Sequence, residues 1–116
     1  MLRTFSSNDI LHKLNFNELV KYLKHEIVNF EDRDFEDIPE KTLILNKDMT
    51  KFFITMPALS YKYGLYINKI GSIFVRETGS ILPSVHSNII VFSTNDGKPL
   101  AILDGNAITN IKCAAI

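Results

Sequence analysis

The sequence predicts an α+β domain in which N-terminal helices precede a mostly antiparallel sheet and a C-terminal helix follows it. Apolar residues recur at helical spacing in the first third of the chain. Short apolar runs broken by turn residues come next, and the last residues return to helical spacing. Because helical and strand patterns do not alternate, no Rossmann domain is expected in this chain.

The composition is that of one soluble globular domain. The 116 residues carry 13 basic and 13 acidic side chains, and 46% of them are hydrophobic, which is enough for one core. Zero net charge gives no electrostatic reason to bind nucleic acid or a membrane, because both need clustered Lys and Arg. The chain has no membrane-length apolar run, no signal peptide and only one cysteine. We therefore expect a cytoplasmic protein.

The first third contains two predicted helices. Ser7 and Asn8 are candidate N-caps for a short helical turn through residues 10–11. Asn15 opens a longer helix, with Glu18 three residues on as in a capping box. The apolar stripe of this helix comprises Phe16, Leu19, Val20, Leu23, Ile27 and Phe30. The other side is expected to carry most of Lys21, Lys24, His25 and Glu26.

A charged segment separates the helices from the first strands. The longer helix should fade within residues 31–37, and Pro39 closes this region because proline disfavours helix at the residue before it. Residues 42–45 form a short apolar run, and a turn leads to a strand at 52–56. Pro57 demotes the end of that strand, because proline has no backbone N–H to donate to a neighbouring strand.

The strongest local signal is a β-hairpin in the second half. A run rich in Tyr, Ile and Phe covers residues 64–74, and a loop is expected at 76–80. Residues 88–92 and 99–103 are apolar runs on either side of an Asp-Gly turn, the usual pattern of a hairpin.

A terminal helix completes the predicted fold. Asp104 or Asn106 can cap it, and apolar residues then continue at helical spacing to Ala115. The helix stops without a glycine cap or a polar tail, so we expect the chain to be cut within a longer protein.

Few residues indicate a specific chemistry. His12 and His25 belong to separate predicted helices, so no metal site is expected. Cys113 could pair with His86 as nucleophile and base, but a thiol in an alanine-rich helix is ordinarily a small buried side chain. The last four residues match a prenylation signal, without an upstream polybasic patch. The five glycines are isolated, so no cofactor-binding loop is expected.

Three lysines remain as candidates for binding an anion, namely Lys41, Lys69 and Lys112. Lys69 interrupts the apolar run from 65 to 74, and two interpretations of it stay open. Its side chain either alternates outward and keeps the ammonium in water, or a partly buried ammonium faces an anionic ligand.

Five ordered segments resemble the ornithine cyclodeaminase/μ-crystallin family. These segments are 39–41, 54–58, 69–74, 82–86 and 97–115. The last is the most specific, because it resembles the family's Gly-x-Pro-Leu-Ala-Leu-Leu-Asp-Gly-Thr-x-Leu-Thr-x-Leu-Arg-Thr-Ala-Ala. The resemblance covers nearly the whole chain and is weakest before Pro39.

The resemblance implies that residues 1–116 form the N-terminal substrate-binding and dimerisation domain of a two-domain NAD(P)-dependent enzyme. Family members include ornithine cyclodeaminases, alanine dehydrogenases and ketimine reductases. In the family this sheet pairs with its twin in a closed β-barrel, which implies a homodimer through the β-sheet. The NAD-binding domain follows the Ala-Ala helix, so this chain is expected to lack it and to be inactive alone.

The resemblance also implies roles for the three lysines. Lys69 matches the family lysine beside the substrate amine and carboxylate, where it stabilises charge and transfers a proton. Lys41 and Lys112 fall where the family usually has arginines that clamp the substrate carboxylate. Lysine gives a point charge without a bidentate fork, so weaker binding of an amino or imino acid is expected.

Two functions are consistent with these observations. The chain is the amino-acid-binding half of an ornithine cyclodeaminase-type lyase, which converts ornithine to proline plus ammonia, or of a related amino- or imino-acid oxidoreductase. Alternatively, it is a non-catalytic dimeric interaction or structural module left from such an enzyme, which accounts for the missing arginines.

Overall fold

The structure, a computed structural model, describes residues 2–31 and 38–116 and confirms the α+β class. The elements of the described residues are β1 (Arg3–Phe5), α1 (Ser7–Lys13), α2 (Phe16–Asn29), β2 (Thr42–Leu45), β3 (Lys51–Ser60), β4 (Leu65–Phe74), β5 (Val85–Ser93), β6 (Pro99–Asp104) and α3 (Gly105–Ala115). The strands form one sheet in the order β1-β6-β5-β4-β3-β2. β1 runs parallel to β6, and all other neighbours are antiparallel.

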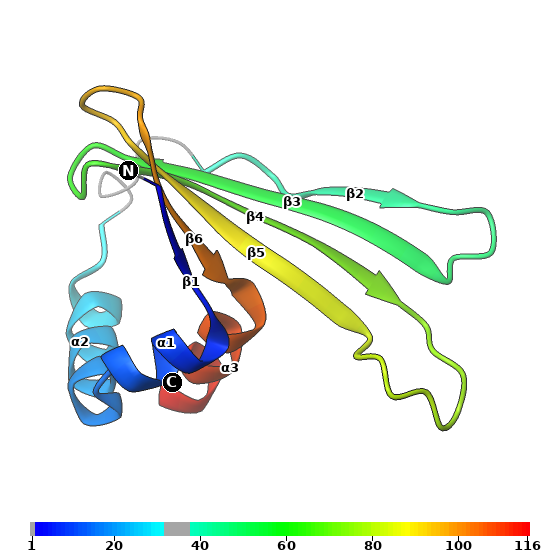
Figure 1. Cartoon of the computed structure of the whole chain (residues 1–116). Helices are drawn as coiled ribbons and strands as arrows, with labels where there is room; N and C mark the ends of the chain where they lie inside the picture. Colours follow the sequence, from blue (N-terminus) through cyan, green and yellow to red (C-terminus); the bar gives the residue numbers. More distant parts are fainter. Residues whose placement is uncertain (1, 32–37) are drawn as a thin grey trace.

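The helices lie together on one side of the sheet (Figure 1). The long strands β3, β4 and β5 extend beyond them, so the opposite face of the sheet carries no helix of the described chain. Side chains alternate between the two faces along each strand. A residue's position along its strand therefore decides whether it faces the helices or the uncovered side. None of the helices in the described ranges is long and apolar enough to cross a bilayer.

The N-terminus differs from the prediction in two respects. The N-cap of α1 is Ser6 rather than Ser7 or Asn8. Ser6 Oγ accepts the Asp9 backbone N–H at 3.2 Å, and Asp9 Oδ2 accepts the Ser6 N–H at 2.9 Å, which completes a capping box. Ahead of this cap, β1 pairs with β6. β1 was not predicted because its three residues are too few to show a strand pattern.

Helix α2 begins where predicted but presents a different side to the protein. Asn15 is its N-cap, and the Asn15 side-chain oxygen accepts the Glu18 N–H at 3.1 Å. Glu26, expected on the polar side, is only 27% exposed. Although α2 is amphipathic, none of its residues is fully buried. The helix ends at Asn29 and Phe30 is extended, so it stops just before the charged segment 31–37 in which its end was predicted; of that segment, residues 32–37 lie outside the described residues.

Pro57 lies inside β3, which is longer than the predicted strand at 52–56. The strand continues to Ser60, and Pro57 pairs with Asn68 of β4. The pairing of β2 with β3 begins at Thr42 opposite Thr55, so Pro57 lies beyond the end of β2. Its missing N–H therefore falls where β3 has become the sheet edge, a position that tolerates proline.

The second half follows the predicted hairpin and helix. β5 and β6 form the hairpin, closed by a Ser93 N–H that donates to the Lys98 carbonyl at 2.9 Å. Asp104 is the cap of α3, because its Oδ1 accepts the Ala107 N–H at 2.8 Å. Cys113 is exposed, which corrects the expectation of a buried thiol. The sequence places it on α3 but does not reveal which side of that helix meets the sheet.

The core of the described chain is small. Ile10, Ala107 and Ala115 are its buried apolar residues, and Ser60 is a buried polar residue at 2% exposure. Two of the apolar three belong to α3, which packs on β5 and β6. Much apolar surface therefore remains accessible on the sheet and on α2, and surfaces of that kind commonly bind ligands or partners.

Candidate functional site

Lys69 lies at the centre of the candidate site, in the middle of β4 on the helix-bearing face. Its ammonium donates a hydrogen bond of 2.6 Å to Thr109 Oγ1 of α3. The side chain is half-buried, and no carboxylate within the described part of the chain lies within ion-pair distance of it. The structure therefore supports a partly buried ammonium rather than a lysine pointing into water.

The position of Thr109 depends on how α3 is attached to β5. Asn106 accepts the Ser87 hydroxyl at 2.8 Å and donates to the Val85 carbonyl at 2.7 Å. Gly105 allows α3 to approach β5, because a Cβ there would lie 2.9 Å from the carbonyl carbon of Ser87. These contacts fix the first turn of α3, and Thr109 follows one turn later.

The other two predicted lysines do not touch Lys69. Lys112 is exposed on α3, three residues beyond Thr109, and Lys41 is exposed just before Thr42 of β2. In the described residues no hydrogen bond or ion pair joins Lys41, Lys69 and Lys112. Strand β3 separates Lys41 from Lys69, with Met56 directly opposite Lys69. The structure brings Lys69 to α3 and leaves two exposed cations at the periphery.

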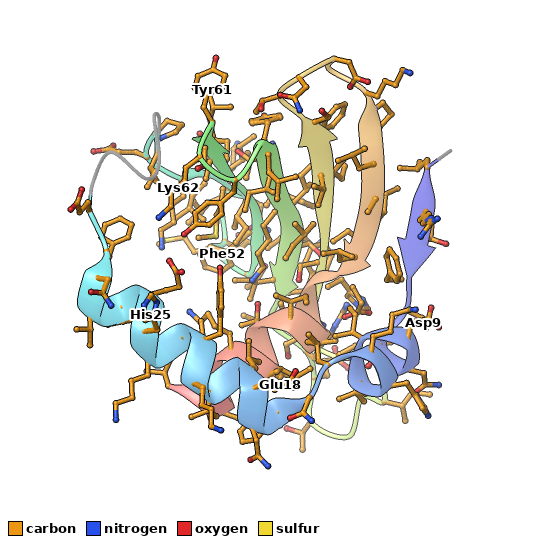
Figure 2. The ribbon with its side chains drawn as sticks, turned by 90° about the vertical axis from the view of Figure 1, so that its left-hand side faces the viewer. Asp9, Glu18, His25, Phe52, Tyr61 and Lys62 are labelled. Atoms are coloured by element: carbon orange, nitrogen blue, oxygen red, sulfur yellow. The ribbon has the colours of Figure 1, made fainter. Side chains whose placement is uncertain are left out.

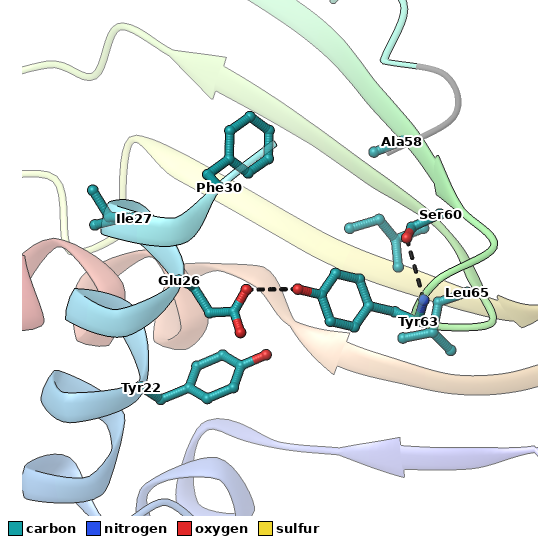
Figure 3. A pocket seen from close by; sticks show the side chains of 9 residues that line it. Tyr22, Glu26, Ile27, Phe30, Ala58, Ser60, Tyr63 and Leu65 are labelled. Atoms are coloured by element: carbon teal, nitrogen blue, oxygen red, sulfur yellow. Dashed lines mark hydrogen bonds between the residues drawn. The ribbon is translucent and has the colours of Figure 1, made fainter. Parts of the chain in front are cut away.

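A pocket of about 640 Å³ lies on the same face of the sheet, between α2 and strands β3 and β4 (Figure 3). Its apolar lining includes Tyr22, Ile27, Phe30, Ala58, Leu65 and Ile67. A polar contact joins its two sides, where the Tyr63 hydroxyl donates to Glu26 Oε2 at 2.6 Å. The four-residue spacing of Tyr22, Glu26 and Phe30 was the sequence signal for this lining, because residues four apart share one face of a helix.

The contact with Glu26 perturbs the Tyr63 phenol. The pKa of Tyr63 is raised above its ordinary value of 10.0, chiefly because its hydroxyl donates to the Glu26 carboxylate, with partial burial adding to the effect. The nearby Lys62 ammonium opposes this change, because a positive charge beside the hydroxyl favours the ionised phenolate. Tyr63 therefore stays neutral and keeps donating at physiological pH.

Other residues considered from the sequence do not assemble into a site. Within residues 2–31 and 38–116 no three His, Cys, Asp or Glu side chains gather as a metal site would require. His12 Nδ1 lies 2.7 Å from the Asn8 carbonyl, within α1. His86 and Cys113 are both exposed, on β5 and α3 respectively.

Comparison with known proteins agrees with this architecture. The family model described as "Ornithine cyclodeaminase/mu-crystallin family" matches residues 3–116. Ketimine reductase mu-crystallin of Mus musculus is 27% identical over 78 residues, which is 67% of this chain and 25% of that protein.

Solved structures show the same fold at lower identity. Thermococcus litoralis Δ1-pyrroline-2-carboxylate reductase, in complex with NADH and L-proline, superposes with a TM-score of 0.82 at 22% identity over 97% of this chain and 35% of that chain. A probable ornithine cyclodeaminase from Bordetella pertussis Tohama I gives 0.76 at 17% identity, over 99% of this chain and 34% of that chain. The chain thus spans about a quarter to a third of these relatives. Its match over residues 3–116 shows that it belongs to the ornithine cyclodeaminase/mu-crystallin family.

Proposed function

We propose that this chain is the amino-acid-binding and dimerisation half of an NAD-dependent enzyme of the ornithine cyclodeaminase type. Its ligand is a small amino or imino acid, and Lys69 is the residue that faces the ligand carboxylate. The observation that supports this most directly is the Lys69 ammonium, held at 2.6 Å by Thr109 on the helix-bearing face.

The hydrogen bonding of Lys69 explains why it suits an anion. An ammonium group has three donors, and Thr109 accepts one of them. A hydroxyl carries no charge, so the positive charge of Lys69 is oriented without being neutralised. Two donors and one full charge then remain for a carboxylate or for negative charge that develops on the reacting atoms.

Lys41 and Lys112 contribute less in this proposal. Both are exposed, so water screens their attraction for a carboxylate, and an exposed charge pair stabilises by less than about 1 kcal/mol. They attract an acid to this side of the sheet, and Lys69 binds it.

The residues of this chain do not fit a dinucleotide. The five glycines are dispersed along the sequence, so no glycine-rich phosphate loop precedes a helix. The N-terminus of α3, where a pyrophosphate would need free N–H groups, is already capped by the Asp104 carboxylate. The hydride chemistry that NAD supplies in the relatives is therefore not assigned to any residue here, and we expect the chain to be inactive alone.

The binding proposal is tested by titrating the 15N-labelled chain at low salt with pyruvate and, separately, with NAD. We expect saturable amide shifts around Lys69 and Thr109 with pyruvate at millimolar concentration, and none with NAD. Lys69→Met keeps the length of the side chain and removes its charge, so it should abolish the shifts. Lys47→Met, in the exposed β2–β3 turn, is the matched control and should bind normally. Pyruvate shifts that survive Lys69→Met would contradict the proposal.

A second function, a dimeric interaction module, is favoured by the uncovered face of the sheet (Figure 1). Because side chains alternate along β4, Ile70 next to Lys69 faces away from the helices. Ile70 is 43% exposed and Phe53 is 46% exposed on that face, and Tyr66 pairs with Phe92 at 5.9 Å between ring centres. An apolar sheet face of this kind is covered in a stable protein, and we propose that a second copy covers it.

Sedimentation equilibrium tests the dimer without reference to any ligand. Ile70→Lys should convert a dimer to a monomer, because it places a charge in the middle of the proposed interface. Ile81→Lys is the control, since Ile81 is 97% exposed in the β4–β5 loop, outside the paired strands. A wild-type monomer, or a dimer that tolerates Ile70→Lys, would contradict this assembly.

A further inference from the structure

We propose that the pocket between α2 and the sheet receives the side chain of the substrate, and that the substrate is an amino or imino acid with a bulky apolar side chain. This inference rests on the proposed function, because it takes Lys69 as the residue that binds the carboxylate. It adds the class of substrate, which neither the fold nor Lys69 itself decides.

The pocket and Lys69 are neighbours on one face of the sheet. Ile67 lines the pocket and lies two residues before Lys69 on β4, so both point to the helix-bearing side. The adjacent strand repeats this arrangement, since Ala58 of the pocket pairs with Ile67 and Met56 pairs with Lys69. Two residues along a strand span about 7 Å. An acid held at Lys69 can therefore extend its side chain directly over Ile67.

The lining of the pocket favours an apolar side chain. Its volume of about 640 Å³ lies within the range of small-molecule sites, and aromatic rings come from Tyr22 and Phe30 on α2. Ala58 and Ile67 form an aliphatic floor, and Ala58 leaves room above it because it has no side chain beyond Cβ. A ring or branched chain placed here would remove apolar surface from water on both sides.

Glu26, the carboxylate among the described lining residues, does not favour a terminal ammonium such as that of ornithine. Glu26 Oε2 already accepts the Tyr63 hydroxyl at 2.6 Å, and Glu26 Oε1 lies 3.9 Å from His25 Nδ1. The ammonium of Lys62 lies over the Tyr63 ring, 5.1 Å from its centre. A second ammonium would therefore enter a region that already holds one cation, whereas a neutral side chain meets no such opposition.

The test compares three acids on the full chain, namely phenylpyruvate, pyruvate and ornithine, with affinities taken from amide shifts. We expect phenylpyruvate to bind at least tenfold more tightly than pyruvate, equivalent to about 1.4 kcal/mol. Tyr22→Ala should remove most of that preference, because Tyr22 lines the pocket that the phenyl ring would enter. Tyr22 is 53% exposed, so the chain can lose this ring and still fold.

Tyr61→Ala is the matched control, because Tyr61 is 62% exposed, is not among the pocket-lining residues and points away from the helices (Figure 2). It should keep the full preference for phenylpyruvate. Equal affinity for phenylpyruvate and pyruvate, or a preference for ornithine that Glu26→Gln removes, would overturn the side-chain assignment while leaving Lys69 as the carboxylate site. If none of the acids binds, the proposed function fails, and this inference fails with it.

Discussion

Replacement of Gly105 by alanine tests how α3 positions the candidate site. A Cβ atom at this position would collide with Ser87 Oγ and lie 2.9 Å from both the Cβ and the carbonyl carbon of Ser87. The hydroxyl could rotate away, but the carbonyl carbon belongs to β5 and cannot. We therefore expect Gly105→Ala to push the first turn of α3 away from the sheet.

The size of the effect follows from two opposing contributions. Forcing a methyl group into a packed contact costs about 1–3 kcal/mol, and the upper end applies here because the obstacle is backbone. Alanine gains up to about 1 kcal/mol over glycine in a helix. The free energy of unfolding should therefore fall by about 2 kcal/mol. At about 4 °C per kcal/mol for a chain of this size, the melting temperature should drop by about 8 °C.

Thermal unfolding followed by circular dichroism measures this change. Ser87→Gly added to Gly105→Ala removes the Oγ and Cβ atoms of the collision, so the double variant should regain part of the loss relative to Ser87→Gly alone. Acid binding at Lys69 should weaken in Gly105→Ala, since Thr109 lies one turn further along the displaced helix. A Gly105→Ala chain that melts at or above the wild-type temperature would refute this description of the contact.

Four further predictions concern polar contacts. Ser6→Ala should destabilise α1 by about 1 kcal/mol in chemical denaturation, and an unchanged midpoint would contradict the capping role. Hydrogen bonds from the Ser6 N–H and hydroxyl lower the pKa of Asp9 below its ordinary value of 3.8. The ionised Asp9 therefore stabilises the fold fully above pH 3.8, and this stabilisation disappears as the pH falls through the lower pKa of the folded state. Asp9→Asn should make the free energy of unfolding less dependent on pH in that range. The pKa of Tyr63 is raised, so its contribution to folding stability is present below pH 10 and disappears as the pH rises through the pKa of the folded state. Absorbance at 295 nm should therefore show one tyrosine that ionises at higher pH than the others, and Tyr63→Phe should remove this late step. Thr109→Val should weaken pyruvate binding severalfold at unchanged stability, and equal affinity would exclude Thr109 as the residue that positions the ammonium.

The elements that the sequence predicted well are those set by local pattern. The hairpin, the Asn15 cap and the Asp104 cap depend on residues close together in the chain, so their side chains and turns identify them. β1 was not predicted, because its three residues show no periodicity and it forms a strand only by pairing with β6. Pro57 is tolerated within β3 because the pairing with β2 stops before it. The length of a neighbouring strand cannot be predicted from the residues around Pro57.

The candidate site likewise has one part that local sequence predicts and another that depends on how the elements pack. Lys69 stood out because it interrupts an apolar strand, and the family resemblance gave it a role. Its partner Thr109 is forty residues away and could be identified only once α3 was packed on the sheet. The half-buried Glu26 and the exposed Cys113 were both misplaced for the same reason, since helical spacing defines a stripe but not which element the stripe contacts.

The most direct test of the central claim observes the Lys69 ammonium itself. In a chain with 15N-labelled lysine side chains, its Nζ resonance is assigned by its loss in Lys69→Met and followed during titration with pyruvate. We predict a saturable shift of this resonance, with the same dissociation constant as the backbone shifts, and a smaller shift for Lys41 and Lys112. A Lys69 resonance that stays unchanged while pyruvate saturates the backbone shifts would show that the carboxylate binds elsewhere.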